Sequence, residues 1–152
     1  MRYLIDTDTC IAIAREKPAH VLARFQQLKP GDIGMSVVTY MELCYGARNS
    51  RVPEANFDKI ARLAAVVPSI PLENSAASYY ADLRVDRERT GRRIGAYDLL
   101  IAAHALALGL VLITNNTDEF PHPGTSRGKL DSPLLDSPLV VAPGEFESPF
   151  RP

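Results

Sequence analysis

Residues 97–113 read YDLLIAAHALALGLVLI, and this stretch decides the fold class of the chain. Its first twelve residues are strongly apolar and favour a buried helix. Gly109 can end that helix, because glycine tolerates the left-handed backbone conformation found at this position. The apolar run 110–113 that follows predicts a short buried strand. A helix that leads directly into a buried strand is the repeating unit of an α/β domain with a mainly parallel sheet.

The chain before this stretch shows the same alternation. We expect short strands at residues 3–5 and 33–38, and a proline-interrupted edge strand at 66–72. Helical patterns lie at residues 10–15, 20–28, 53–64 and 74–89. A further helix is expected to begin at a cap, either Ser36 or Thr39, and to end at residue 48. We therefore predict one α/β domain, residues 1–120, with a mainly parallel sheet of four or five strands flanked by helices.

The composition changes after Phe120. Residues 121–152 contain seven prolines and neither a helical nor an alternating apolar pattern. Such a segment offers no continuous apolar face that could pack on a core. We expect this tail to be disordered or loosely packed.

The charge balance narrows the possible partners. The 152 residues carry a formal net charge of −1, with 46% hydrophobic residues, which suits one globular domain with a core. This net charge gives no overall attraction to nucleic acid, so phosphate binding must come from a local patch. Five arginines crowd one stretch, at positions 84, 87, 89, 92 and 93. They form either a solvated surface or a site that binds phosphates, and Arg92 and Arg93 lie in the loop just before the helix that begins near residue 97.

The two cysteines, Cys10 and Cys44, fit no zinc-binding or redox spacing. We expect both to be reduced thiols. The start of the chain shows no signal-peptide pattern, and its apolar runs are too short to span a bilayer. These features predict a cytoplasmic protein that does not enter a membrane.

Acidic residues recur where strands end or helices begin. Asp6 follows the first strand, Glu42 and Asp98 lie early in helices, and Asp118 and Glu119 follow the strand at 110–113. Such positions face one edge of a parallel sheet, where several carboxylates repel one another unless a cation holds them. Oxygen ligands select Mg²⁺ or Mn²⁺. Taken singly, each acid is explained as a helix cap, a solvated residue or a partner of the helix dipole, but their coincidence favours a metal site.

Four motifs carry a resemblance to a known family. They are Leu4-Ile-Asp6-Thr-Asp-Thr9, Tyr40-Met-Glu42-Leu-Cys-Tyr-Gly46, Ile94-Gly-Ala-Tyr-Asp98-Leu-Leu-Ile-Ala-Ala-His-Ala105 and Thr114-Asn-Asn-Thr-Asp-Glu-Phe120. In this order they resemble the PIN-domain ribonucleases, and within them the VapC toxins of type II toxin–antitoxin pairs. The resemblance extends from Met1 to about Phe120.

The resemblance implies a three-layer PIN-like fold and a Mg²⁺- or Mn²⁺-dependent endoribonuclease. It implies that Asp6, Glu42 and Asp98 are catalytic metal ligands. For the fourth acid the resemblance points to Glu119, because Asn116 stands where many relatives have an aspartate. The implied partners are an RNA substrate, a VapB-type antitoxin and a second copy of the chain. We expect Arg92 and Arg93 to contact the RNA, because they lie just before Asp98. The subgroup pattern also implies transfer RNA as the substrate, with the initiator transfer RNA as a candidate.

Four polar residues lie beside the acids and can support them. Their side chains can hydrogen-bond a ligand carboxylate or the attacking water, which is the usual function of groups just outside a metal's own ligands. These residues are Thr7, Thr114, Asn116 and Asp118.

Two other functions stay open, and so does the origin of the tail. The chain could be a catalytically impaired toxin homologue that only binds antitoxin. Asp6-Thr-Asp8 also resembles the start of haloacid-dehalogenase-like phosphatases, although Cys10 stands where that pattern has Thr. Relatives usually finish with a strand resembling Gly-Leu-Arg-Val-Glu-Asn-Trp. Some codon choices for residues 124–130 encode that heptad in the neighbouring reading frame, so a frameshift near Pro121 is a further hypothesis.

Overall fold

A parallel sheet forms the centre of the molecule. In the computed structural model, the residues described are 1–15, 25, 28–29, 31–91, 94–114 and 140–141. Five strands lie in the order β3-β2-β1-β4-β5, and all neighbouring pairs are parallel. The strands are β1 (Tyr3–Ile5), β2 (Ile33–Ser36), β3 (Ser69–Ile70), β4 (Val111–Ile113) and β5 (Val140–Val141). The predicted α/β fold with a mainly parallel sheet is therefore confirmed.

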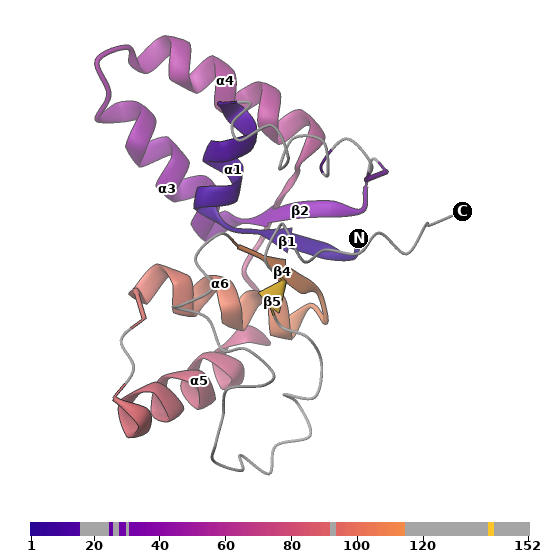
Figure 1. Cartoon of the computed structure of the whole chain (residues 1–152), viewed down its shortest axis with the longest axis vertical. Helices are drawn as coiled ribbons and strands as arrows, with labels where there is room; N and C mark the ends of the chain where they lie inside the picture. Colours follow the sequence, from indigo (N-terminus) through magenta and orange to yellow (C-terminus); the bar gives the residue numbers. More distant parts are fainter. Residues whose placement is uncertain (16–24, 26–27, 30, 92–93, 115–139, 142–152) are drawn as a thin grey trace.

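Helices cover both faces of the sheet. They are α1 (Thr7–Ala14), α3 (Val37–Arg48), α4 (Pro53–Val66), α5 (Ala76–Thr90) and α6 (Ala96–Ala107). Figure 1 shows α1, α3 and α4 on one side and α5 and α6 on the other. The central strand explains this, because successive side chains of a strand point to opposite faces. Tyr3 and Ile5 join the core beneath α1, α3 and α4, whereas Leu4 joins the core beneath α5 and α6. The three-layer arrangement is confirmed.

Some element boundaries differ from the prediction. The strand expected at 33–38 ends at Ser36, because the Ser36 hydroxyl accepts the backbone N–H of Val38 at 3.1 Å and starts α3. The edge strand expected at 66–72 is reduced to β3, which does lie at the edge of the sheet. Most of the helix expected at 20–28 lies outside the described residues.

One strand lies within the tail, where the sequence predicted none. Val140 pairs with Leu112 and Val141 with Ile113, so β5 extends the sheet beside β4. A two-residue strand is too short to show the alternation from which a strand is predicted. The domain boundary at residue 120 stays a prediction, because residues 115–139 and 142–152 lie outside the described part of the chain.

A buried histidine joins the two helical layers. His104 in α6 places its Nδ1 atom 2.9 Å from the hydroxyl oxygen of Ser36, and both residues are buried. Ser36 also caps α3, so one side chain ties α6 to the start of α3. Burial lowers the pKa of His104, although a contact with the backbone of Pro71 opposes this shift. The histidine is therefore neutral when folded at neutral pH.

We predict that this histidine makes the fold less stable in mild acid. A lowered pKa means that the unfolded chain binds the proton first, so stability is lost as pH falls below about 6.5 towards the folded pKa. Thermal melts of the wild type and of His104→Gln at pH 8 and pH 5.5 test this. On acidification, the melting temperature of the wild type should fall further than that of the variant. Equal losses would contradict the prediction, because His20 and His122 are present in both proteins and cancel.

Candidate functional site

Asp6 lies where the central strand β1 and its neighbour β4 both end. It follows β1 directly and is the N-cap of α1, with its Oδ1 atom accepting the backbone N–H of Thr9 at 2.8 Å. Its own backbone N–H donates to the carbonyl of Ile113 at the end of β4, at 3.2 Å. Thr114 follows that strand and donates its hydroxyl to Oδ2 of Asp6. Both carboxylate oxygens are therefore oriented by hydrogen bonds, and the residue is only 3% exposed.

The environment of Asp6 disfavours its charge. Burial raises the pKa of Asp6, while hydrogen bonds from Thr114 and Thr9 lower it and the neighbouring charge of Asp8 raises it further. A buried carboxylate without sufficient compensation is costly in free energy. A bound cation would remove much of that cost, so this carboxylate suits a metal ligand as well as a helix cap.

Glu42 is connected to Asp6 through one threonine. Glu42 lies in the second turn of α3 and is half-buried. The hydroxyl of Thr7, the first residue of α1, donates to its Oε2 atom. Because Thr7 directly follows Asp6, the two carboxylates share one neighbourhood at the end of β1. The hydrogen bonds expected of Thr7 and Thr114 to acidic side chains are thus present.

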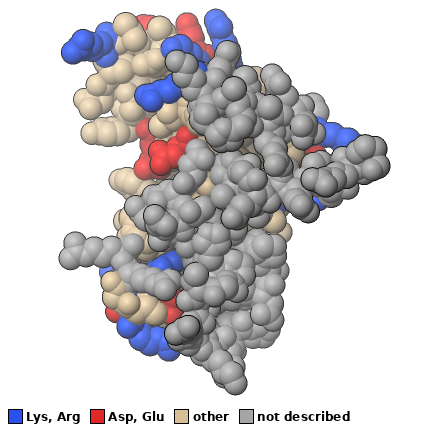
Figure 2. All heavy atoms as spheres, in the orientation of Figure 1, with Lys and Arg blue, Asp and Glu red and all other residues tan. Residues whose placement is uncertain are grey.

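Asp98 lies in the first turn of α6 and is partly buried. Helix α6 runs into β4 through a short turn, so it is antiparallel to the strands and begins at their carboxyl edge. Helices α1 and α3 also begin at this edge, directly after β1 and β2. Asp6, Glu42 and Asp98 therefore all lie at the carboxyl edge of the sheet, although α6 covers the opposite face from α1 and α3. Figure 2 shows acidic atoms gathered on the visible face of the molecule, between the regions where Figure 1 draws α3 and α6.

The described acidic side chains do not form a complete metal-binding cluster. Among the residues that the structure describes, no three His, Cys, Asp or Glu side chains come together closely enough to hold a metal ion. The pair Asp6 and Glu42 still fits Mg²⁺ in chemistry, because this ion keeps several waters and needs only one or two carboxylates. The remaining predicted site residues lie outside the described part: Arg92, Arg93, Asn116, Asp118 and Glu119.

Two features of this region were not predicted from the sequence. One is the Ser36–His104 hydrogen bond, which joins residues far apart in the chain. The other is the burial of Arg87, which is only 6% exposed. Arg87 follows Leu83 by four residues and Tyr80 by seven, so the helical spacing places it on the same face as these packed residues. This spacing could have indicated that Arg87 is buried, but the neighbouring charged residues suggested an exposed helix surface.

Comparisons with known proteins agree with this geometry. A family model described as "PIN domain" matches residues 3–124. The chain belongs to the PIN-domain family. This PIN domain is 38% identical to "tRNA(fMet)-specific endonuclease VapC" of Shigella flexneri over 127 residues, which cover 84% of this chain and 96% of the relative. It is 36% identical to the Salmonella typhimurium protein of the same name, with 79% and 90% covered.

Solved structures give the same result. The DNA-bound VapBC structure from Salmonella typhimurium matches with a TM-score of 0.73 and 36% identity, covering 79% of this chain and 90% of the other. VapBC2 from Rickettsia felis, bound to a DNA fragment from its promoter, matches with a TM-score of 0.72 and 30% identity, covering 77% and 89%. The resemblance to VapC-type PIN domains is confirmed, and PIN-domain ribonucleases generally depend on a divalent metal.

These observations also decide against the phosphatase alternative. Asp8, the second acid of the phosphatase-like pattern, is an exposed residue within α1, and membership of the PIN family removes the reason to consider a phosphatase. No helix among the described residues combines the length and the apolar character needed to cross a membrane.

We predict that Asp6→Asn stabilises the metal-free PIN domain. Asparagine can keep the cap to Thr9, but it removes the buried charge. In excess chelator at pH 7, the melting temperature should rise by about 2–4 °C, which is roughly 1 kcal/mol for a domain of this size. Asp8→Asn is the matched control, because Asp8 is exposed and should change little. A lower melting temperature for Asp6→Asn than for Asp8→Asn would contradict the prediction.

Proposed function

We propose that this protein is a divalent-metal-dependent endoribonuclease and the toxin of a VapBC-type toxin–antitoxin pair. The observation that carries the chemistry is the buried Asp6 carboxylate, fixed by Thr9 and Thr114 beside the Thr7–Glu42 hydrogen bond. The biological assignment is supported by relatives named as VapC ribonucleases and by matching structures of VapBC complexes.

Asp6, Glu42 and Asp98 are the proposed catalytic metal ligands, with Glu119 as the fourth acid and Mg²⁺ or Mn²⁺ as the ion. When bound, such an ion makes a water nucleophilic at neutral pH and neutralises charge on the leaving oxygen. Thr114 and Thr7 keep one oxygen of Asp6 and one of Glu42 in a fixed direction. The N-terminus of α6 adds a partial positive charge at the same edge, which favours an approaching phosphate.

The proposed substrate is transfer RNA, with the initiator transfer RNA as the first candidate, because two relatives carry that specificity in their names. The proposed protein partners are a VapB-type antitoxin and a second copy of the chain. We place the protein in the cytoplasm, where transfer RNA is found and where the unpaired Cys10 and Cys44 remain thiols. Residues 1–120 are the proposed nuclease domain, followed by an atypical tail.

One alternative belongs to the same family. A catalytically impaired toxin that only binds its antitoxin is favoured by a single observation, the amide Asn116 at a position where an acid is expected. The two proposals differ in RNA cleavage, and the next two experiments separate them.

We predict that Asp6→Asn and Asp98→Asn each lower RNA cleavage by at least about a hundredfold, because changes even outside the ligand set of a metal cost about 10–100-fold. Wild-type cleavage of transfer RNA should cease in chelator and return with added Mg²⁺ or Mn²⁺. Asp8→Asn is the control and should cleave at nearly the wild-type rate. Cleavage by the wild type that persists in chelator would exclude the metal mechanism, and a wild type that never cleaves would favour the binding-only toxin.

A separate prediction concerns the fourth acid. If Glu119 is a ligand, Glu119→Gln should reduce cleavage far more than Asn116→Ala or Asp118→Asn does, because only the first change removes a ligand charge. Isothermal titration of Mn²⁺ should show the same order. Small and equal losses in the three variants would mean that the site uses only Asp6, Glu42 and Asp98.

A further inference from the structure

The two layers of helices carry different acids of the proposed site. Glu42 lies on α3, which covers one face of the sheet, and Asp98 lies on α6, which covers the other. A metal ion that contacts both carboxylates needs these two helices in a fixed relative position, because a productive geometry has to be kept within about 0.5 Å. Contacts that hold α3 against α6 therefore bear directly on the site.

A buried hydrogen bond joins these two helices. The hydroxyl oxygen of Ser36 lies 2.9 Å from Nδ1 of His104, and the two residues are 0% and 1% exposed. The same oxygen accepts the backbone N–H of Val38 at 3.1 Å, which leaves the hydroxyl proton to be donated to the neutral ring. Val38 also joins the apolar core that α6 forms, so α3 and α6 pack against each other at this point. Breaking the bond at this depth leaves a buried polar atom unpaired.

The Ser36–His104 bond is placed to act on both acids. Glu42 follows Ser36 by six residues, and Asp98 precedes His104 by six residues. Each acid therefore lies about 9 Å along its helix from the bond, at about 1.5 Å per residue. A helix is stiff over this length, so a shift where α3 and α6 meet moves both carboxylates. A misplacement of about 1 Å within a site can cost about a hundredfold in rate.

We propose that the Ser36–His104 hydrogen bond positions Glu42 relative to Asp98 and thereby sets the affinity of the site for a divalent metal ion. This proposal rests on the metal-dependent ribonuclease function proposed above. Ser36 and His104 are positioning residues, because they act through α3 and α6 and are assigned no contact with metal or RNA. Removing the bond should weaken metal binding in addition to any loss of stability.

Thr39 offers a matched control on the same helix. It lies three residues after Ser36 and is 0% exposed, but its hydroxyl oxygen has no hydrogen-bond partner among the described residues. Thr39→Val removes this hydroxyl and keeps the shape of the side chain. Ser36→Ala and Thr39→Val therefore each remove one buried hydroxyl from the start of α3, but Ser36→Ala also removes a bond to α6.

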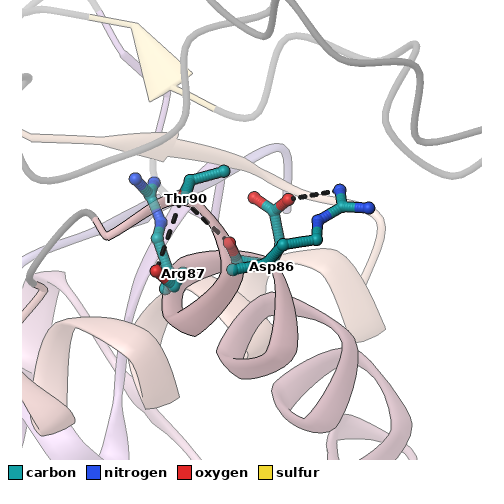
Figure 3. Close-up of polar contacts among 4 residues, drawn as sticks. Asp86, Arg87 and Thr90 are labelled. Carbon is teal, nitrogen blue, oxygen red and sulfur yellow. Dashed lines mark hydrogen bonds and ion pairs between the residues drawn. The ribbon is translucent and has the colours of Figure 1, made fainter.

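Helix α5 offers a control for polar contacts that stay within one helix. Figure 3 shows Asp86, whose carboxylate pairs with Arg89 at 3.1 Å, and Thr90, whose hydroxyl donates to the backbone carbonyl of Asp86 at 2.9 Å. These contacts join residues of α5 to one another, so they do not fix one helix relative to another. Arg89→Ala removes the ion pair and should leave metal binding unchanged.

The experiment measures Mn²⁺ binding to the full chain by isothermal titration at pH 8, well below the melting temperature of each variant. Ser36→Ala and His104→Leu should each raise the Kd for Mn²⁺ about fivefold, which is less than the 10–100-fold cost of losing a direct partner of a metal ligand. The double variant should raise the Kd no further than the single ones, because both changes break the same bond. Thr39→Val and Arg89→Ala should bind Mn²⁺ like the wild type.

The variants at His104 separate the bond from the cap of α3. His104→Leu keeps the cap, because the N–H of Val38 still donates to Ser36. His104→Asn should restore wild-type affinity, because the side-chain oxygen of asparagine lies as many bonds from the backbone as Nδ1 does and accepts the Ser36 proton. Thermal melts in chelator measure stability separately. A merely structural role would lower the melting temperature and leave the affinity for Mn²⁺ unchanged.

Three results would overturn the proposal. If the wild type binds Mn²⁺ and cleaves RNA, but Ser36→Ala and His104→Leu bind Mn²⁺ like Thr39→Val, the positioning proposal fails and the ribonuclease proposal stands. If His104→Asn binds Mn²⁺ as weakly as His104→Leu, the hydrogen bond is not the cause and the positioning proposal fails. If the wild type neither binds Mn²⁺ nor cleaves RNA, both proposals fail. Should Ser36→Ala fail to fold, His104→Leu against Thr39→Val decides alone.

Discussion

The fold and the site depend on one buried carboxylate at the end of the central strand. Asp6 ends β1, starts α1 and accepts a hydrogen bond from Thr114 at the end of the neighbouring strand β4. Because β1 is the middle strand of the sheet, its carboxyl end is the point on which neighbouring strands and helices converge. The free-energy cost of burying this charge is offset by two hydrogen bonds and the start of a helix. Burial still raises the pKa of Asp6 despite these contacts, so the carboxylate suits a position beside a cation.

The positions of the other two acids depend on how their helices are held against this point. Ser36 caps α3, which carries Glu42, and its hydroxyl also contacts His104 of α6, which carries Asp98. A single buried hydroxyl therefore ties the start of α3 to the last turn of α6. Thr7 adds a direct contact between α1 and Glu42. The site is thus held by hydroxyl groups from three helix and strand ends, while the carboxylates keep oxygen atoms for a ligand.

Much of this architecture could be predicted from local patterns, since strand ends and helix starts depend on neighbouring residues. The helix and strand within residues 97–113, the cap at Ser36 and the grouping of Asp6, Glu42 and Asp98 on one edge follow from such patterns. The strand expected to reach residue 38 was too long, because a capping hydroxyl outweighed the β preference of two valines. Strand β5 and the Ser36–His104 contact depend on residues distant in sequence, which no local pattern reveals.

The placement of charge explains how a chain with a net charge of −1 can act on RNA. The carboxylates that suit a metal ion also repel phosphate, so an acidic site alone weakens RNA binding. Attraction must then come from the bound ion and from the partial positive charge at the start of α6, which lies at the same edge of the sheet. On this reasoning the acids set where the chain cleaves, and the ion that they hold offsets their own repulsion of the phosphate.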